Sequence, residues 1–347
     1  MVVPGSIPKM IRSVLVLNFR IIVVMQSSKN ISFILKFFIV VLALWFMYQK
    51  VFANENLIEM YQWFLSAFKE QASWLLVLVL LLMFLNWLLE SVKWKFLIKK
   101  EEEVSLWLSI KAVFLGITVS IFTPNRIGEF GGRVFCLEKA DRIKAVLITV
   151  LGNMGQLLTT TIFGTIAFVY YVQSYSGFLD GEDDYWFFIL VFIVAIVVST
   201  LIALYLNSSW LSSFFMKFKF LRKYEEYCDV FSYYSTNELL YVIFLSCARY
   251  AVFSFQFYIL LYFFQVDISM LESLTMSSLL FLTISIIPTI ALTEIGVRGS
   301  IAIYFFGLVS ANHVGILTAT FALWFANLVL PALLGTILVY NLKFFRK

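Results

Sequence analysis

The feature that most constrains this chain is a series of apolar stretches, each long enough to cross a lipid bilayer. The segment Tyr185 to Leu206 contains no charged residue, and about 20 consecutive apolar residues form a helix that spans the roughly 30 Å hydrocarbon core. Hydrophobic residues make up 62% of the sequence and charged residues only 14%, which leaves no segment suited to a separate water-soluble domain. The chain is therefore predicted to be an all-α polytopic membrane protein.

Hydropathy predicts six full spans and two shorter hairpins. The predicted spans are Ile31–Ala53, Ala72–Ile98, Ile143–Val172, Tyr185–Leu206, Leu239–Phe264 and Gly315–Tyr340. Each hairpin pairs an apolar stretch that ends just before a proline with a shorter apolar piece: Leu106–Phe122 with Val134–Leu137, and Leu274–Ile287 with Ile301–Val309. Whether each hairpin is re-entrant or makes two complete crossings stays open, because either form returns the chain to the side from which it came.

The two ends of the chain are basic. Residues 1–30 contain a short apolar run, Val14 to Val24, that is interrupted by polar residues and matches neither a span nor a signal peptide. This segment is either an amphipathic stretch on the cytoplasmic leaflet or upstream sequence before a true translation start at Met25. A single membrane domain is predicted over 31–341, followed by a basic cytoplasmic tail at 342–347.

Basic residues are concentrated on one set of predicted loops, and that side faces the cytoplasm in most membrane proteins. They are Lys93, Lys95, Lys99, Lys100, Arg126, Lys139, Arg142, Lys144, Lys217, Lys219, Arg222, Lys223, Lys343, Arg346 and Lys347. With this orientation both termini are cytoplasmic, and the two hairpins open to opposite sides. Residues 31–172 and 185–341 then form two inverted-topology repeats, an arrangement that recurs in alternating-access transporters.

A charged motif, Glu-x-Gly-x-Arg, occurs once in each predicted hairpin, as Glu129 to Arg133 and as Glu294 to Arg298. In a helix its glutamate and arginine share one face and can neutralise each other. An anionic headgroup is expected to compete for the arginine, which donates two parallel hydrogen bonds to phosphate, and to free the glutamate for an amine or a proton. The alternative is that both pairs are structural salt bridges that fix the hairpins.

Several residues near the motifs are further candidates. Arg126 and Arg249 are predicted to help bind an anionic headgroup, although Arg249 has the alternative of pairing with Glu90 or with backbone carbonyls. Turning points and positions of close approach are expected at the prolines and glycines of the hairpins, namely Pro124, Gly128, Gly131, Pro288 and Gly296.

Metal, cofactor and nucleic-acid functions find no support in the sequence. The chain has one histidine, His313, and three cysteines without C-x-x-C spacing, so no metal site and no cofactor are predicted. No histidine pair or nucleophile elbow lies at membrane depth, which argues against an enzyme. Aromatic and basic residues of Ser208–Tyr234 favour contact with anionic lipid rather than with nucleic acid.

The residues Thr123-Pro124-Asn125-Arg126-Ile127-Gly128-Glu129 and Ile295-Gly296-Val297-Arg298 resemble motifs of the lysylphosphatidylglycerol synthase transmembrane, or flippase, family. The likeness covers roughly Ile31 to Tyr340. Members with synthase activity carry a cytoplasmic aminoacyl-transferase domain after the membrane part, whereas this chain ends at Lys347. The resemblance therefore implies movement of a lipid between leaflets without synthesis of the aminoacyl lipid.

These features predict translocation of a phospholipid, an aminoacyl-phospholipid, or a polyprenyl-linked or glycosylated lipid across a bacterial inner membrane. The expected partners are membrane lipids with anionic headgroups, carried by alternating exposure of the two hairpins. The alternative is a non-transporting accessory subunit that binds lipid and scaffolds a glycosyltransferase or an envelope-assembly partner. The sequence leaves the headgroup, the energy source and the oligomeric state open.

Overall fold

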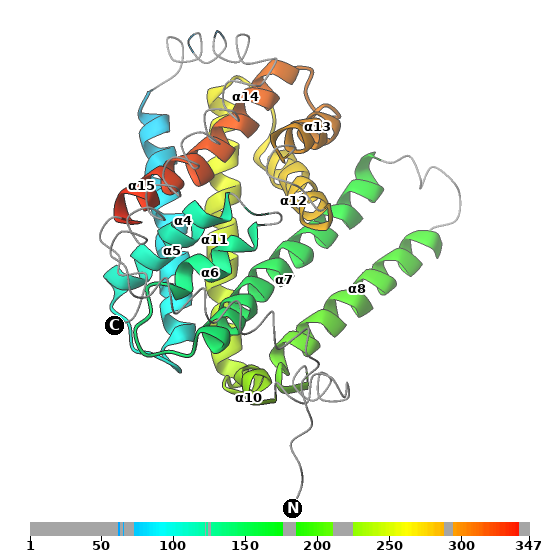
Figure 1. Ribbon diagram of the computed structural model, residues 1–347. Coiled ribbons are helices and arrows are strands. Elements are labelled where there is room, and N and C mark those ends of the chain that lie inside the picture. Colours follow the sequence, from blue (N-terminus) through cyan, green and yellow to red (C-terminus); the bar gives the residue numbers. More distant parts are fainter. Residues whose placement is uncertain are drawn as a thin grey trace, which may run out of the picture.

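The computed structural model describes residues 62, 65, 73–121, 123, 126–175, 185–210, 225–287 and 294–339, and these ranges are helical without any strand (Figure 1). The predicted first span Ile31–Ala53, the basic segment 1–30 and the tail 342–347 lie outside the described residues. Pro124 and Pro288 do too, so their predicted role as turning points stays a prediction.

Five helical segments of the described chain are long and apolar enough to cross a membrane. They are α4 (Trp74–Ile98), α7 (Arg142–Tyr175), α8 (Tyr185–Leu206), α11 (Thr236–Phe263) and a composite rod of α14 (His313–Trp324), the π-helical turn η4 (Phe325–Val329) and α15 (Leu330–Val339). Five of the six predicted spans are thereby confirmed within a few residues, and the fold is a polytopic all-α membrane protein.

Both predicted hairpins consist of two helices. The first contains α5 (Leu106–Ser120) and α6 (Gly128–Val134), and the second contains α12 (Met270–Ile286) and α13 (Glu294–Phe306). At 1.5 Å per residue the 15 residues of α5 and the 17 of α12 are about 23 and 26 Å long, shorter than the roughly 30 Å core. The second legs begin earlier than hydropathy predicted, because each charged motif is itself helical.

Serine residues define where three of these helices begin. Ser105 caps α5 by accepting a hydrogen bond from the Leu108 amide at 3.1 Å. Ser235 and Ser269 each stand three residues before a glutamate and form complete capping boxes at the starts of α11 and α12. These caps satisfy amide groups that the first helical turn leaves without partners.

Close helix contacts depend on glycine in this bundle. A Cβ atom on Gly132 of α6 would lie only 2.7 Å from the Cα of Gly116 in α5, and one on Gly164 of α7 would lie 2.5 Å from the Cβ of Leu282 in α12. Small residues let neighbouring membrane helices approach to this extent, and dispersion contacts then stabilise the pair. The first hairpin is thus packed tightly on itself.

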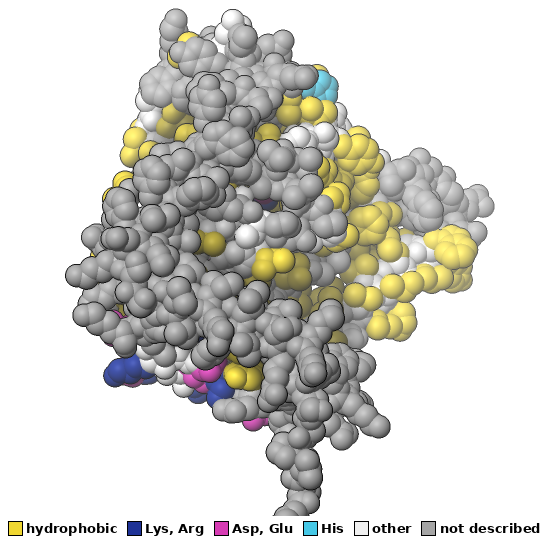
Figure 2. All heavy atoms as spheres, in the orientation of Figure 1, with side chains coloured by type: hydrophobic (Ala, Val, Ile, Leu, Met, Phe, Trp, Pro, Cys, Tyr) yellow, Lys and Arg dark blue, Asp and Glu magenta, His cyan; other side chains and the backbone are white. Residues whose placement is uncertain are grey.

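Helix α8 stands at the edge of the bundle and is exposed along almost all of its length (Figure 1). Its single buried residue is Tyr205, whose hydroxyl donates to the Leu151 carbonyl of α7 at 3.3 Å. Figure 2 shows hydrophobic side chains over this edge of the molecule, whereas most charged side chains visible on this face lie at its lower end. Such an apolar belt is what lipid tails cover in a membrane protein.

Candidate functional site

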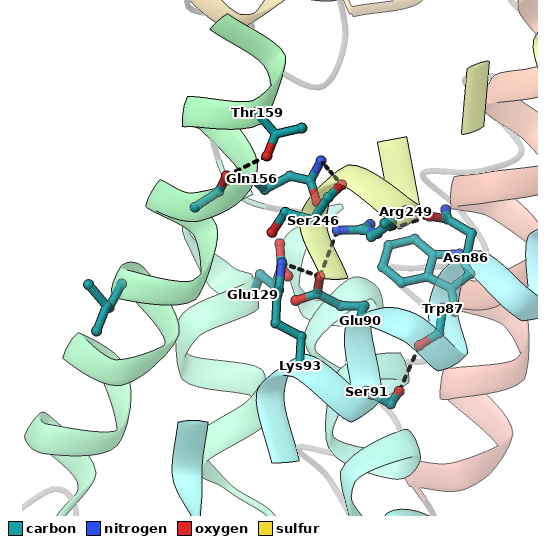
Figure 3. A network of polar contacts seen from close by, with 12 residues as sticks. Asn86, Trp87, Glu90, Ser91, Lys93, Glu129, Gln156, Thr159, Ser246 and Arg249 are labelled. Atoms are coloured by element: carbon teal, nitrogen blue, oxygen red, sulfur yellow. Dashed lines mark hydrogen bonds and ion pairs between the residues drawn. The ribbon is translucent and has the colours of Figure 1, made fainter. Parts of the chain in front are cut away.

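The centre of the polar network is Glu90 on α4, whose side chain is 1% exposed. Its two carboxylate oxygens contact three cations: Arg133 Nη1 at 2.8 Å, Lys93 Nζ at 2.8 Å and Arg249 Nη1 at 2.7 Å. Figure 3 shows Glu90 beside Lys93 from its own helix and Arg249 from α11. One carboxylate therefore links α4, α6 and α11.

Arg133, the arginine of the first motif, is completely enclosed, with 1% of its side chain exposed. It lies between Glu90 and Glu129, the glutamate of its own motif, with which it forms a second ion pair. The predicted pairing four residues apart is confirmed. Because both neighbours are carboxylates held by packed helices, the geometry supports the structural alternative for this copy of the motif.

The second motif is more open. Arg298 Nε donates to Glu294 Oε1 at 3.0 Å, and the Arg298 side chain is 19% exposed. The same oxygen of Glu294 also accepts from Arg126 Nη2 at 2.6 Å. Arg126 comes from the loop before α6 and has a φ of 58°, which is uncommon for a residue other than glycine. Glu294 thus joins the two hairpins.

A chain of buried amides extends the network toward the composite rod. Arg249 Nε donates to Asn86 Oδ1 at 2.9 Å, and Asn86 Nδ2 donates to Asn327 Oδ1 at 3.2 Å. Asn327 Nδ2 donates in turn to Gln256 Oε1 at 2.8 Å. Asn327 lies in the π-helical turn η4, a distortion that is common at functional sites.

Beside this network lies a cavity of about 250 Å³, here called the cationic cavity. Three arginines line it, Arg126, Arg249 and Arg298, and none of the described residues in its lining is acidic. The Arg249 guanidinium stacks 4.8 Å from the ring centre of Trp87, which also lines the cavity and fixes the orientation of the charge. The remaining walls mix aromatic and aliphatic side chains with polar groups such as Gln156 and Thr160.

The charges around the cavity do not balance. Among the described residues the ion pairs form two separate sets: Lys93, Arg133 and Arg249 with Glu90 and Glu129, and Arg126 and Arg298 with Glu294. With all groups ionised, each set carries a net charge of plus one. Isolated charges are costly in an apolar surrounding, so such an excess favours an anionic ligand.

The structure brings most of the predicted site residues together, but some of them line the cavity and others are enclosed. Arg126, Arg249 and Arg298 line the cationic cavity, whereas Arg133 and Glu129 lie in the enclosed part of the network. The alternative pairing of Arg249 with Glu90 is present in the structure, and Arg249 also lines the cavity, whereas its binding of an anionic headgroup stays a prediction. Within the described ranges no group of three or more His, Cys, Asp and Glu side chains is arranged to hold a metal ion.

Close approach was predicted for either the backbone or a lipid headgroup; the structure shows approach by the protein at one of the three described glycines, and approach by a headgroup stays a prediction. A Cβ on Gly128 would lie 2.7 Å from the Val119 carbonyl oxygen, so this glycine is packed against the first leg. At Gly131 and Gly296, in contrast, no described atom lies within 4 Å of the position that a Cβ would occupy. There the protein does not crowd the glycine, because neither position faces the neighbouring helix as Gly132 does.

Two parts of the network were not predicted from the sequence. Lys93 was counted among the basic loop residues, but it lies within α4, is 1% exposed and pairs with Glu90. The amide chain of Asn86, Gln256 and Asn327 was missed as well. The available signal was a single polar amide inside each of three strongly apolar stretches, since a buried amide in a membrane needs a partner.

Residues 33–335 match the family described as Lysylphosphatidylglycerol synthase TM region. The match includes both charged motifs, Glu90, Arg249 and the amide chain. No curated protein sequence and no solved structure gives a significant match to the chain.

Proposed function

Because the chain belongs to the lysylphosphatidylglycerol synthase TM region family, we propose that it moves an anionic lipid between the leaflets of a bacterial inner membrane. The observation that carries this proposal is the cationic cavity, which presents three arginines and no carboxylate among the described residues that line it. A cavity of this kind inside an apolar bundle suits a phosphate-containing headgroup, because guanidinium groups donate paired hydrogen bonds to phosphate oxygens.

The charge excess indicates how many negative charges the site accepts. The two sets of ion pairs among the described residues each carry one excess positive charge, so together they can balance two negative charges. A phosphodiester supplies one of these, and a phosphomonoester or a pyrophosphate diester supplies up to two. A zwitterionic headgroup adds no net charge, so anionic lipids are the preferred substrate class.

Glu294 is the internal anion that an incoming headgroup would replace. The same carboxylate oxygen accepts from Arg126 at 2.6 Å and from Arg298 at 3.0 Å, so these two cavity arginines share one negative charge while the site is empty. A phosphate that binds both guanidinium groups replaces this shared carboxylate. The contact that Glu294 makes between the two hairpins is then weakened, which couples headgroup binding to hairpin movement.

The two helical hairpins are the elements expected to move. Each has a first leg shorter than the hydrocarbon core is thick, and each carries a charged motif at the start of its second leg. With cytoplasmic termini the two hairpins have opposite orientations, as in inverted-repeat transporters. Alternating exposure of the cavity to the two leaflets follows if one hairpin opens while the other closes.

The experiment is leaflet exchange of fluorescent lipids in proteoliposomes, with headgroups that carry zero, one or two negative charges. The informative variant is Arg249→Gln, because Glu90 retains Arg133 and Lys93 as partners when Arg249 is neutralised. Loss of a charged hydrogen bond costs about 1.5–3 kcal/mol, so exchange of anionic lipids should fall roughly 10- to 150-fold. Arg142→Gln at the start of α7 is the matched control.

Two results would contradict the proposal. One is equal exchange of anionic lipids by wild-type protein and by Arg249→Gln. The other is absence of exchange by folded wild-type protein for every headgroup tested, which would favour a non-transporting accessory subunit.

A further inference from the structure

A second cavity, of about 200 Å³, lies against α13 and α14 and is here called the glycine cavity. It shares three lining residues with the cationic cavity: Arg298, Thr320 and Trp324. The two cavities therefore adjoin each other at these residues. Among the described residues, Arg298 is the charged group that lines both spaces.

The walls of the glycine cavity are mostly apolar. Ile295, Ile303, Leu317 and Phe321 contribute to its lining, whereas Arg298 is the only charged residue among the described ones that line it. The two hydroxyl groups are already engaged, since Ser300 Oγ donates to the Gly296 carbonyl at 2.9 Å and Thr320 Oγ1 donates to the Ile316 carbonyl at 2.8 Å. This lining suits uncharged aliphatic or ester groups better than an ion.

Gly296 lies at the open edge of this cavity. It lines the cavity from within helix α13, is exposed, and has no described atom within 4 Å of the position of a Cβ atom. Glycine inside a helix costs about 1 kcal/mol relative to alanine, and none of the described helices requires its small size here. A side chain at this position would narrow the cavity from its edge.

We propose that the glycine cavity holds the glycerol and the first methylene groups of the lipid whose phosphate binds in the cationic cavity. Arg298 sits between the two parts and contacts the phosphate, while Gly296 limits the bulk of the chain region that is accepted. This inference rests on the proposed function, because it places the apolar part of the same anionic lipid. It predicts that lipid selectivity depends on the chain-proximal region as well as on the headgroup.

The test compares two probes in purified protein: phosphatidylglycerol and its deacylated form, glycerophosphoglycerol. Gly296→Leu adds a side chain at the edge of the glycine cavity without changing any charge. It should weaken phosphatidylglycerol binding at least about tenfold, which equals about 1.4 kcal/mol or roughly two buried methylene groups. Binding of glycerophosphoglycerol should change less than about twofold, which is under about 0.4 kcal/mol.

Gly131→Leu is the matched control, because Gly131 occupies the same motif position, is equally open and lines neither cavity. It should bind both probes as the wild type does. Gly296→Ala adds a smaller side chain and should give an intermediate loss of phosphatidylglycerol binding. It replaces Gly296→Leu in the test if the leucine variant does not fold. Thermal melting of each variant reports on folding.

The possible outcomes distinguish failure of the glycine-cavity assignment from failure of the proposed function. Unchanged phosphatidylglycerol binding by folded Gly296→Leu, or an equal loss of both probes, overturns the assignment of the glycine cavity and leaves the proposed function standing. Wild-type protein that binds neither probe, or Arg249→Gln that binds both as tightly as wild type, contradicts the proposed function itself.

Discussion

Glu90 is the residue whose neutralisation should affect this protein most. Its carboxylate contacts Arg133, Lys93 and Arg249 at 2.7–2.8 Å and is 1% exposed. Glu90→Gln retains the shape of the side chain but raises the net charge of its set of ion pairs from plus one to plus two. Removal of one partner from a buried ion pair costs about 3–5 kcal/mol, because the remaining charge stays buried without compensation.

Lys93 is the cation left without a described carboxylate partner in this variant. Arg133 keeps Glu129, and Arg249 keeps Asn86 and the face of Trp87, but Glu90 is the only carboxylate whose contact with Lys93 is described. The double variant Glu90→Gln with Lys93→Met should therefore recover part of the lost stability. Residues in direct contact typically show coupling energies of about 0.5–3 kcal/mol in such cycles.

The assay is thermal unfolding of the purified protein in detergent, with the two single variants and the double variant measured in parallel. Glu103→Gln is the control, because Glu103 is 81% exposed and its contact with Lys99 at 3.7 Å should contribute little. A melting temperature of Glu90→Gln equal to that of the wild type would refute the reasoning. So would a double variant that melts below Glu90→Gln.

Two further predictions concern other buried groups. Asn327→Leu removes the acceptor of Asn86 and the donor to Gln256. Each buried group left without a hydrogen bond costs about 1–3 kcal/mol, so the variant should melt at a clearly lower temperature than the wild type. An unchanged melting temperature would show that the amide chain is dispensable for stability. Burial raises the pKa of the Cys136 thiol to about 12. Because only the thiolate reacts, maleimide should label Cys136 slowly in folded protein up to pH 9 and rapidly after unfolding, as mass spectrometry of the labelled peptide would show.

The spans were predictable because their signal is local and strong. Tyr185–Leu206 is a helix over the same residues that hydropathy indicated, since an uninterrupted apolar run has no alternative in a membrane. The motif pairs were predictable for the same reason, because four residues in one helix fix which side chains meet. Sequence spacing alone thus determined Glu129–Arg133 and Glu294–Arg298.

The long-range partners could not be read from spacing. Asn86 and Asn327 are 241 positions apart, and nothing in either apolar stretch indicates which helix will pack against it. Lys93 was misassigned because it lies close to the exposed lysines Lys99 and Lys100 near the end of a span. A lysine at such a place usually extends to the membrane surface, but here it points into the bundle because Glu90 lies one turn away.

The duplicated motif also shows how tertiary contacts distinguish two identical patterns. Arg133 is enclosed because α4 supplies Glu90, so two carboxylates surround one guanidinium. Arg298 shares its single motif carboxylate with Arg126, remains 19% exposed and faces both cavities. Under the proposed function this difference is what alternating access requires, because two inverted hairpins must adopt unlike conformations at any moment. The structure then corresponds to a state in which the second motif is accessible and the first is closed.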